Sequence, residues 1–102
     1  MNFANLVQQA QQMQRKVNKV KKAFDDKEFD FVSQNSVISG KIKGNLEIIS
    51  LNIDSSLMNN DSKEDVEDLL IVTLNQIIKK VSQEREDTIN KVTNGVDVSA
   101  FL

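Results

Sequence analysis

The stretch from Phe3 to Phe24 reads FANLVQQAQQMQRKVNKVKKAF. Its apolar residues recur at alternating steps of three and four, a spacing of about 3.5 residues that is typical of a long helix with a narrow apolar seam. The seam consists of Phe3, Leu6, Ala10, Met13, Val17, Val20 and Phe24. We therefore predict one helix over residues 3–24. Asp25 and Asp26 should end it, because aspartates are poor helix formers and are unfavourable at the negative end of the helix dipole.

The same stretch carries five basic side chains and no acidic one: Arg15, Lys16, Lys19, Lys21 and Lys22. All acidic residues lie outside this stretch, and they bring the net charge of the whole chain to −2. Such clustering matters more than the total charge for binding a polyanion. At about 100° per residue, Arg15, Lys19 and Lys22 share one helix face, opposite the seam. Two interpretations of this face stay open: a solvated surface, or a contact with DNA phosphates.

Between residues 28 and 53 the apolar period changes to two, which predicts three short strands in a meander. We place them at about residues 28–34, 37–43 and 46–53, with turns at 34–36 and at Gly44-Asn45. Ile48 and Ile49 interrupt the alternation, and this doublet predicts either a β-bulge or a strand that is buried on both faces.

Residues 63–93 form the second predicted helix, with Ser62 as its N-cap and Asn94-Gly95 as its C-cap. Its apolar residues cover nearly the whole circumference between residues 66 and 81, which is more than three short strands can bury. We therefore expect a homodimer, the commonest way to bury such a surplus. Residues 94–102 would form a short tail with no assigned partner. The residues expected in core or dimer contacts are Leu6, Ala10, Met13, Val17, Val20, Phe24, Ile49, Leu51, Ile53, Leu70, Leu74 and Ile77.

Composition excludes several kinds of site. With 102 residues the chain fits a single domain, 1–102. It has no Cys and no His, and its glycines are isolated, so thiol chemistry, zinc sites and Gly-rich phosphate loops are excluded. We therefore expect no enzyme activity, no cofactor, no metal and no small-molecule substrate. No segment has the character of a secretory signal or a membrane span, so we expect a cytoplasmic protein.

Three segments carry a family resemblance: NLVQQAQQMQ at residues 5–14, IDSSL at 53–57, and VEDLL at 66–70 with Asn75 after it. In order and spacing they resemble the opening helix, the exit of the third strand and the start of the last helix of the YbaB/EbfC family of bacterial nucleoid-associated proteins. The resemblance implies an α+β fold with an α-β-β-β-α protomer and a three-stranded antiparallel sheet. It also implies a homodimer formed through the sheet and the helices, with long helices that project like tweezers.

The resemblance further implies DNA binding with modest sequence preference and no catalysis. Leu74 and Ile77 stand where the family typically has small alanines. Together with the charge pattern, the resemblance predicts a nucleoid-associated homodimer that contacts the phosphates of double-stranded DNA. Arg15, Lys16, Lys19 and Lys22 would make these contacts, with Lys21 in support. The alternative is a dimeric adaptor that holds another protein through its helices and does not bind DNA.

Overall fold

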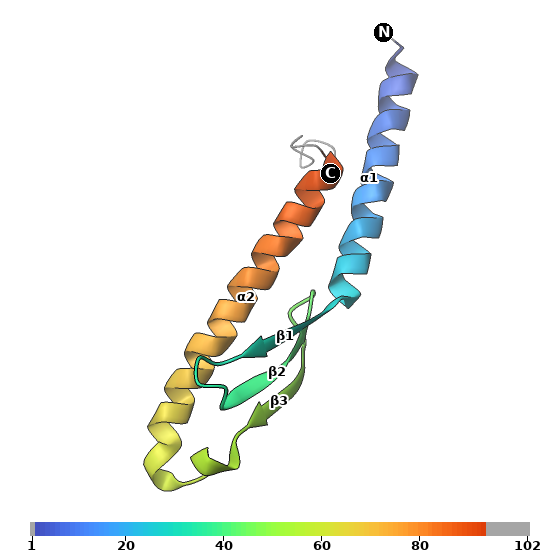
Figure 1. The fold of residues 1–102 in the computed structure, drawn as a ribbon. Helices are drawn as coiled ribbons and strands as arrows, with labels where there is room; N and C mark the ends of the chain where they lie inside the picture. The colour runs from blue at the N-terminus through green and yellow to red at the C-terminus, as the bar shows by residue number, and fades with distance from the viewer. Residues whose placement is uncertain (1, 94–102) are drawn as a thin grey trace.

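The computed structural model of the chain describes residues 2–93 (Figure 1). Its order of elements confirms the predicted α+β fold with an α-β-β-β-α protomer. The predicted C-cap at Asn94-Gly95 and the tail after it lie outside the described residues. The elements are helix α1 (Phe3–Asp26), strands β1 (Glu28–Val32), β2 (Ile38–Lys43) and β3 (Ile48–Ile53), 3-10 turns η1 (Ser55–Leu57) and η2 (Asn60–Ser62), and helix α2 (Lys63–Thr93).

Helix α1 begins after Asn2, whose side-chain Oδ1 accepts a hydrogen bond from the backbone N–H of Ala4 at 3.0 Å. Helix α1 ends at Asp26, so Asp25 and Asp26 mark its end as expected, and both aspartates belong to its last turn. Each has a cation that offsets its cost at the negative end of the dipole. Arg85 Nε lies 3.3 Å from Asp25, and Lys43 Nζ lies 3.6 Å from Asp26.

The sheet is antiparallel with the order β1-β2-β3, so β3 is an edge strand. Lys41 pairs with Ser50 and Ile42 pairs with Ile48, which leaves Ile49 without a partner. Of the two alternatives for the isoleucine doublet, the structure therefore has the β-bulge. The strands are shorter than the sequence pattern suggested. Leu46, for example, belongs to the β2–β3 turn, where its φ of 72° is incompatible with a strand.

The β2–β3 turn is attached to the end of α1. The backbone N–H of Gly44 donates to the carbonyl oxygen of Lys27 at 2.8 Å, and that of Asn45 donates to the carbonyl oxygen of Asp25 at 3.3 Å. A Cβ atom at Gly44 would lie 1.8 Å from the carbonyl oxygen of Phe24, so no other residue fits without displacing the backbone. This close approach fixes the direction in which α1 leaves the sheet.

The core lies between the sheet and α2, which packs on β1 and β2. Its buried members are Phe24, Phe31, Ile42, Ile77 and Val81, and Phe29, Leu74 and Ile78 pack against them. Leu74 and Ile77, where the family resemblance leads one to expect small alanines, therefore fill the core of the protomer itself.

The chain enters α2 through η2 rather than directly from a loop. The predicted N-cap, Ser62, is the last residue of η2, and its backbone N–H donates to the side-chain Oδ1 of Asn59 at 2.9 Å. The earlier turn η1 begins in the same manner, with a hydrogen bond from the Ser56 N–H to Asp54 Oδ1 at 2.9 Å. This hydrogen bond lowers the pKa of the Asp54 carboxyl below its ordinary value, because it stabilises the charged form.

Candidate nucleic-acid interface

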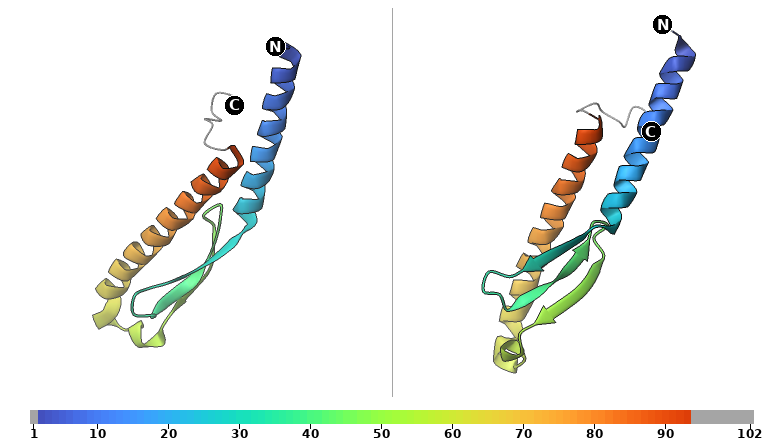
Figure 2. Two further views of the ribbon diagram at one scale, coloured as in Figure 1. Left: turned by 45° about the horizontal axis from the view of Figure 1, so that its top comes forward. Right: turned by 45° about the vertical axis from the view of Figure 1, so that its right-hand side comes forward.

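Helix α1 forms an arm that projects from the body of the molecule. Figure 1 and Figure 2 show that its N-terminal half runs beyond the described end of α2, and that the two helices run in opposite directions. The molecule is accordingly elongated, measuring 70 × 18 × 16 Å along its principal axes. A charged face on such an arm is accessible to a partner as large as duplex DNA.

One face of the arm is basic and exposed. Arg15, Lys19 and Lys22, which we call the basic face, are all exposed to solvent. On the opposite side, Val17 and Phe24 are buried. The helix is therefore oriented as its seam requires, with the cations pointing away from the protein. Lys16 is also exposed, at the border between the basic face and the seam.

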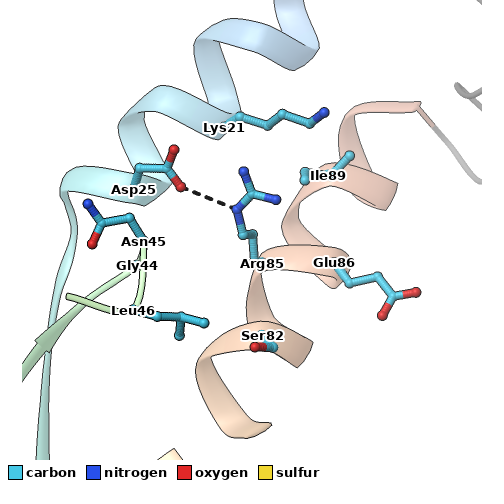
Figure 3. Close-up of a pocket in the computed structure, with 9 residues that line it drawn as sticks. All are labelled: Lys21, Asp25, Gly44, Asn45, Leu46, Ser82, Arg85, Glu86 and Ile89. Atoms are coloured by element: carbon cyan, nitrogen blue, oxygen red, sulfur yellow. Dashed lines mark hydrogen bonds and ion pairs between the residues drawn. The ribbon is translucent and has the colours of Figure 1, made fainter. Parts of the chain in front are cut away.

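Lys21 differs from the other four cations. It is half-buried and lines an open cleft of about 660 Å³ between the end of α1, the β2–β3 turn and α2 (Figure 3). In this cleft Arg85 makes its ion pair with Asp25, and Glu86 contributes a second acid. Lys21 therefore faces a cleft of mixed charge. It does not extend the basic face.

The residues predicted for core or dimer contacts lie in three kinds of environment. Those that are buried within the protomer are Val17, Phe24 and Ile77. Those that are half-buried are Ala10, Met13, Val20, Ile53, Leu70 and Leu74. Those that remain exposed are Leu6, Ile49 and Leu51. The exposed group marks where the protomer leaves apolar surface in water.

One of these surfaces follows the edge strand. We call Ile48, Ile49 and Leu51 the β3 patch; each is between two fifths and one half exposed. Leu51 is paired with Gly40 and Ile48 with Ile42, so both lie on the sheet face that α2 covers over β1 and β2. On α2 itself, Ile71 is 60% exposed and Val72 53%. The sequence pattern alone did not single out Ile48 for such a contact, because its place depends on the bulge.

The part of the chain between residues 2 and 93 holds no cluster of three acidic, His or Cys side chains arranged to bind a metal ion. None of the helices in the described part is long and apolar enough to cross a membrane. What the arm offers a partner is a set of cations on one exposed face of a helix.

Comparison with known proteins identifies the family of the chain. The model of the YbaB/EbfC DNA-binding family matches residues 1–96. The chain belongs to this family. A nucleoid-associated protein of Clostridium novyi is 33% identical over 102 residues, which is 100% of this chain and 90% of that protein. Another, from Malacoplasma penetrans, is 37% identical over 95 residues, or 93% of this chain and 96% of its own length.

The family fold is also found among solved structures. The crystal structure of an uncharacterized protein from Helicobacter pylori superposes with a TM-score of 0.73 at 25% sequence identity, and covers 85% of this chain and 91% of that chain. The YbaB/EbfC family is a DNA-binding family rather than a family of enzymes.

Proposed function

We propose that this protein is a nucleoid-associated homodimer that binds double-stranded DNA through the phosphates, with weak sequence preference. The observation that carries the proposal is the basic face: three exposed cations on one side of a projecting helix that has no acidic residue before Asp25, in a member of a DNA-binding family. Lys16 would add a contact at the border of this face. Lys21 would contribute only to the local potential, because it faces the cleft.

The spacing of the basic face suits a phosphate backbone. Arg15 and Lys22 are seven residues apart, about 10 Å along the helix axis. The phosphate charges of duplex DNA are spaced about 1.7 Å apart along its axis, so each cation finds a phosphate without any particular register. No aromatic side chain lies between these cations, so the arm offers nothing for stacking on exposed bases. Contacts of this kind position a protein on DNA and carry little sequence information.

The homodimer is supported by the exposed apolar surface of the protomer. The β3 patch, together with Ile71 and Val72, would be covered by the same surface of a second copy, as a two-fold axis requires. An exposed apolar edge strand is otherwise a liability for aggregation. In such a dimer the basic face would be present twice, which doubles the number of phosphates neutralised.

The experiment is a DNA-binding titration of a triple variant, Arg15→Gln, Lys19→Gln and Lys22→Gln. Its control is a second triple variant, Lys79→Gln, Lys80→Gln and Lys91→Gln, which removes three exposed cations from α2 and gives the same net charge. We expect the first variant to lose at least about tenfold in affinity for mixed-sequence duplex, because each phosphate contact releases counterions. The control should lose less.

An equal loss in both variants would mean that only net charge matters and would overturn the role of the basic face. A parent protein that does not shift duplex DNA at low salt would favour the alternative, a dimeric adaptor for another protein.

A further inference from the structure

The outer part of the arm carries an apolar stripe that nothing in the described residues covers. Phe3 is 77% exposed, Leu6 44% and Val7 40%, and Ala10 is half-buried. These four residues, which we call the arm stripe, continue the seam that is buried against α2 further along the helix, where Val17 is only 1% exposed. The seam thus emerges from the protein with its apolar character intact.

The described end of α2 lies level with the point where the seam emerges. Arg85 and Asp25 are joined by an ion pair, and the two helices run in opposite directions. Eight residues beyond Arg85 is Thr93, and eight residues before Asp25 is Val17. Since both helices advance about 1.5 Å per residue, these two residues lie at a similar height. The described part of α2 therefore ends at the height of the inner end of the uncovered seam.

The length of the segment that follows Thr93 suits the stripe. From Val17 to Phe3 the helix rises about 21 Å. Residues 94–102 number nine, and nine extended residues span up to about 30 Å. Nine residues are therefore long enough to span the distance from the level of Val17 to Phe3.

Its chemistry also suits the stripe. Five of the seven residues from Val96 to Leu102 are apolar, and Asp97 is the one charged residue among them. Residues 3–24 of the arm include cations and no acid, so Asp97 would meet no repulsion there. We propose that residues 96–102 dock on the arm stripe of their own protomer.

Docking at this place would leave DNA binding unobstructed. At about 100° per residue, the centre of the arm stripe lies about 135° around the helix from the centre of the basic face of α1. The tail would shield the apolar side of the arm from water and stiffen a helix whose outer half otherwise lacks tertiary support. This inference does not depend on DNA binding, and its test needs no DNA.

The test uses a single tryptophan. The chain has no Trp and no Tyr, so Phe101→Trp introduces one clean fluorescent reporter into the tail. In the folded full chain we expect this tryptophan to emit at shorter wavelength than it does in urea. The emission should stay the same when the protein is diluted. Adding Leu6→Asn and Val7→Asn should shift the emission to longer wavelength. The control is Val32→Asn, at a residue that is also exposed but lies on β1, and it should leave the emission unchanged.

A solvent-like emission in the folded Phe101→Trp protein would overturn the proposal, as would an emission that ignores the two substitutions in the stripe. A second measurement identifies the occupant. The chain has no cysteine, so Val7→Cys with Phe101→Cys allows one new disulfide. We expect the cross-link within a single polypeptide on a denaturing gel. A cross-link between two polypeptides, or an emission that changes on dilution, would assign the stripe to a second copy and contradict the proposal.

Discussion

At the scale of single residues, Ser33 shows how one side chain completes the first hairpin. Its side chain is buried, and its Oγ accepts a hydrogen bond from the backbone N–H of Ile38 at 3.1 Å and donates one to Asn35 Oδ1 at 3.1 Å. Its own backbone N–H donates to the carbonyl oxygen of Ile38 at 2.8 Å. The sequence pattern extended the strand through Ser33, whereas the hydroxyl replaces a further ladder bond and turns the chain.

This contact predicts the effect of Ser33→Ala. Removing the hydroxyl leaves the buried N–H of Ile38 without its partner, so the free energy of unfolding should fall by about 1–3 kcal/mol. Urea denaturation followed by circular dichroism measures this loss. Ser55→Ala is the control, because that side chain is exposed and η1 uses the backbone carbonyl oxygen of Ser55, which accepts from the N–H of Met58. Equal stability of the two variants would show that the Ser33 hydroxyl has no such role.

At the scale of elements, the direction of α1 depends on a contact that is remote in sequence. The β2–β3 turn presses against the last turn of α1 at Gly44, and Arg85 of α2 holds Asp25 from the other side. The heptad spacing was sufficient to predict the helix and the face that it buries. The aspartate pair marked the end of the helix in the sequence, but the cation that pairs with Asp25 was not predictable, because Arg85 lies sixty positions further along the chain.

The same distinction applies to the candidate site. The spacing of Arg15, Lys19 and Lys22 was enough to place them on one face, since that follows from helix geometry alone. The surroundings of Lys21 could not be predicted without the position of α2, because the cleft that it lines is formed by Arg85 and Glu86 together with the β2–β3 turn. The β3 patch could not be predicted without the bulge at Ile49. The isoleucine doublet in the sequence was compatible with either a bulge or a strand buried on both faces.

The contact at Gly44 predicts that Gly44→Ala destabilises the fold. The added methyl group would overlap the backbone of Phe24, and relief of that overlap would separate the turn from α1. We expect a loss of about 3 kcal/mol, at the upper end of the range for overpacking. Gln34→Ala, at an exposed position in the β1–β2 turn, should change stability little. A Gly44→Ala protein as stable as its parent in urea would refute the close approach of turn and helix.

At the scale of the whole molecule, the opposite charges are separated along the chain. Residues 3–24 of the arm carry cations and no acid, whereas the first turn of α2 carries Glu64 and Asp65. The β3 patch and the exposed part of α2 provide the apolar surface. We expect these surfaces to bring two protomers together, and the arms to engage DNA in parallel.

Leu51→Glu tests the dimer. Leu51 is partly exposed in the protomer, so the glutamate would remain solvated in a single copy but would be desolvated between two. Light scattering should give twice the chain mass of 11.5 kDa for the parent and a mass nearer 11.5 kDa for the variant. Lys41→Glu, an exposed change in β2, is the control and should remain a dimer. A parent that is monomeric would remove the dimer from the proposal.

The central claim is that the basic face neutralises DNA phosphates, and the salt dependence of binding tests it most directly. For duplex DNA, the logarithm of the binding constant falls with the logarithm of the salt concentration, with a slope of about −0.9 for each phosphate neutralised. Replacing Arg15, Lys19 and Lys22 by Gln in both copies removes up to six such contacts. The slope should therefore become less steep by up to about five. Parallel salt-dependence lines for the parent and the triple variant would contradict the account.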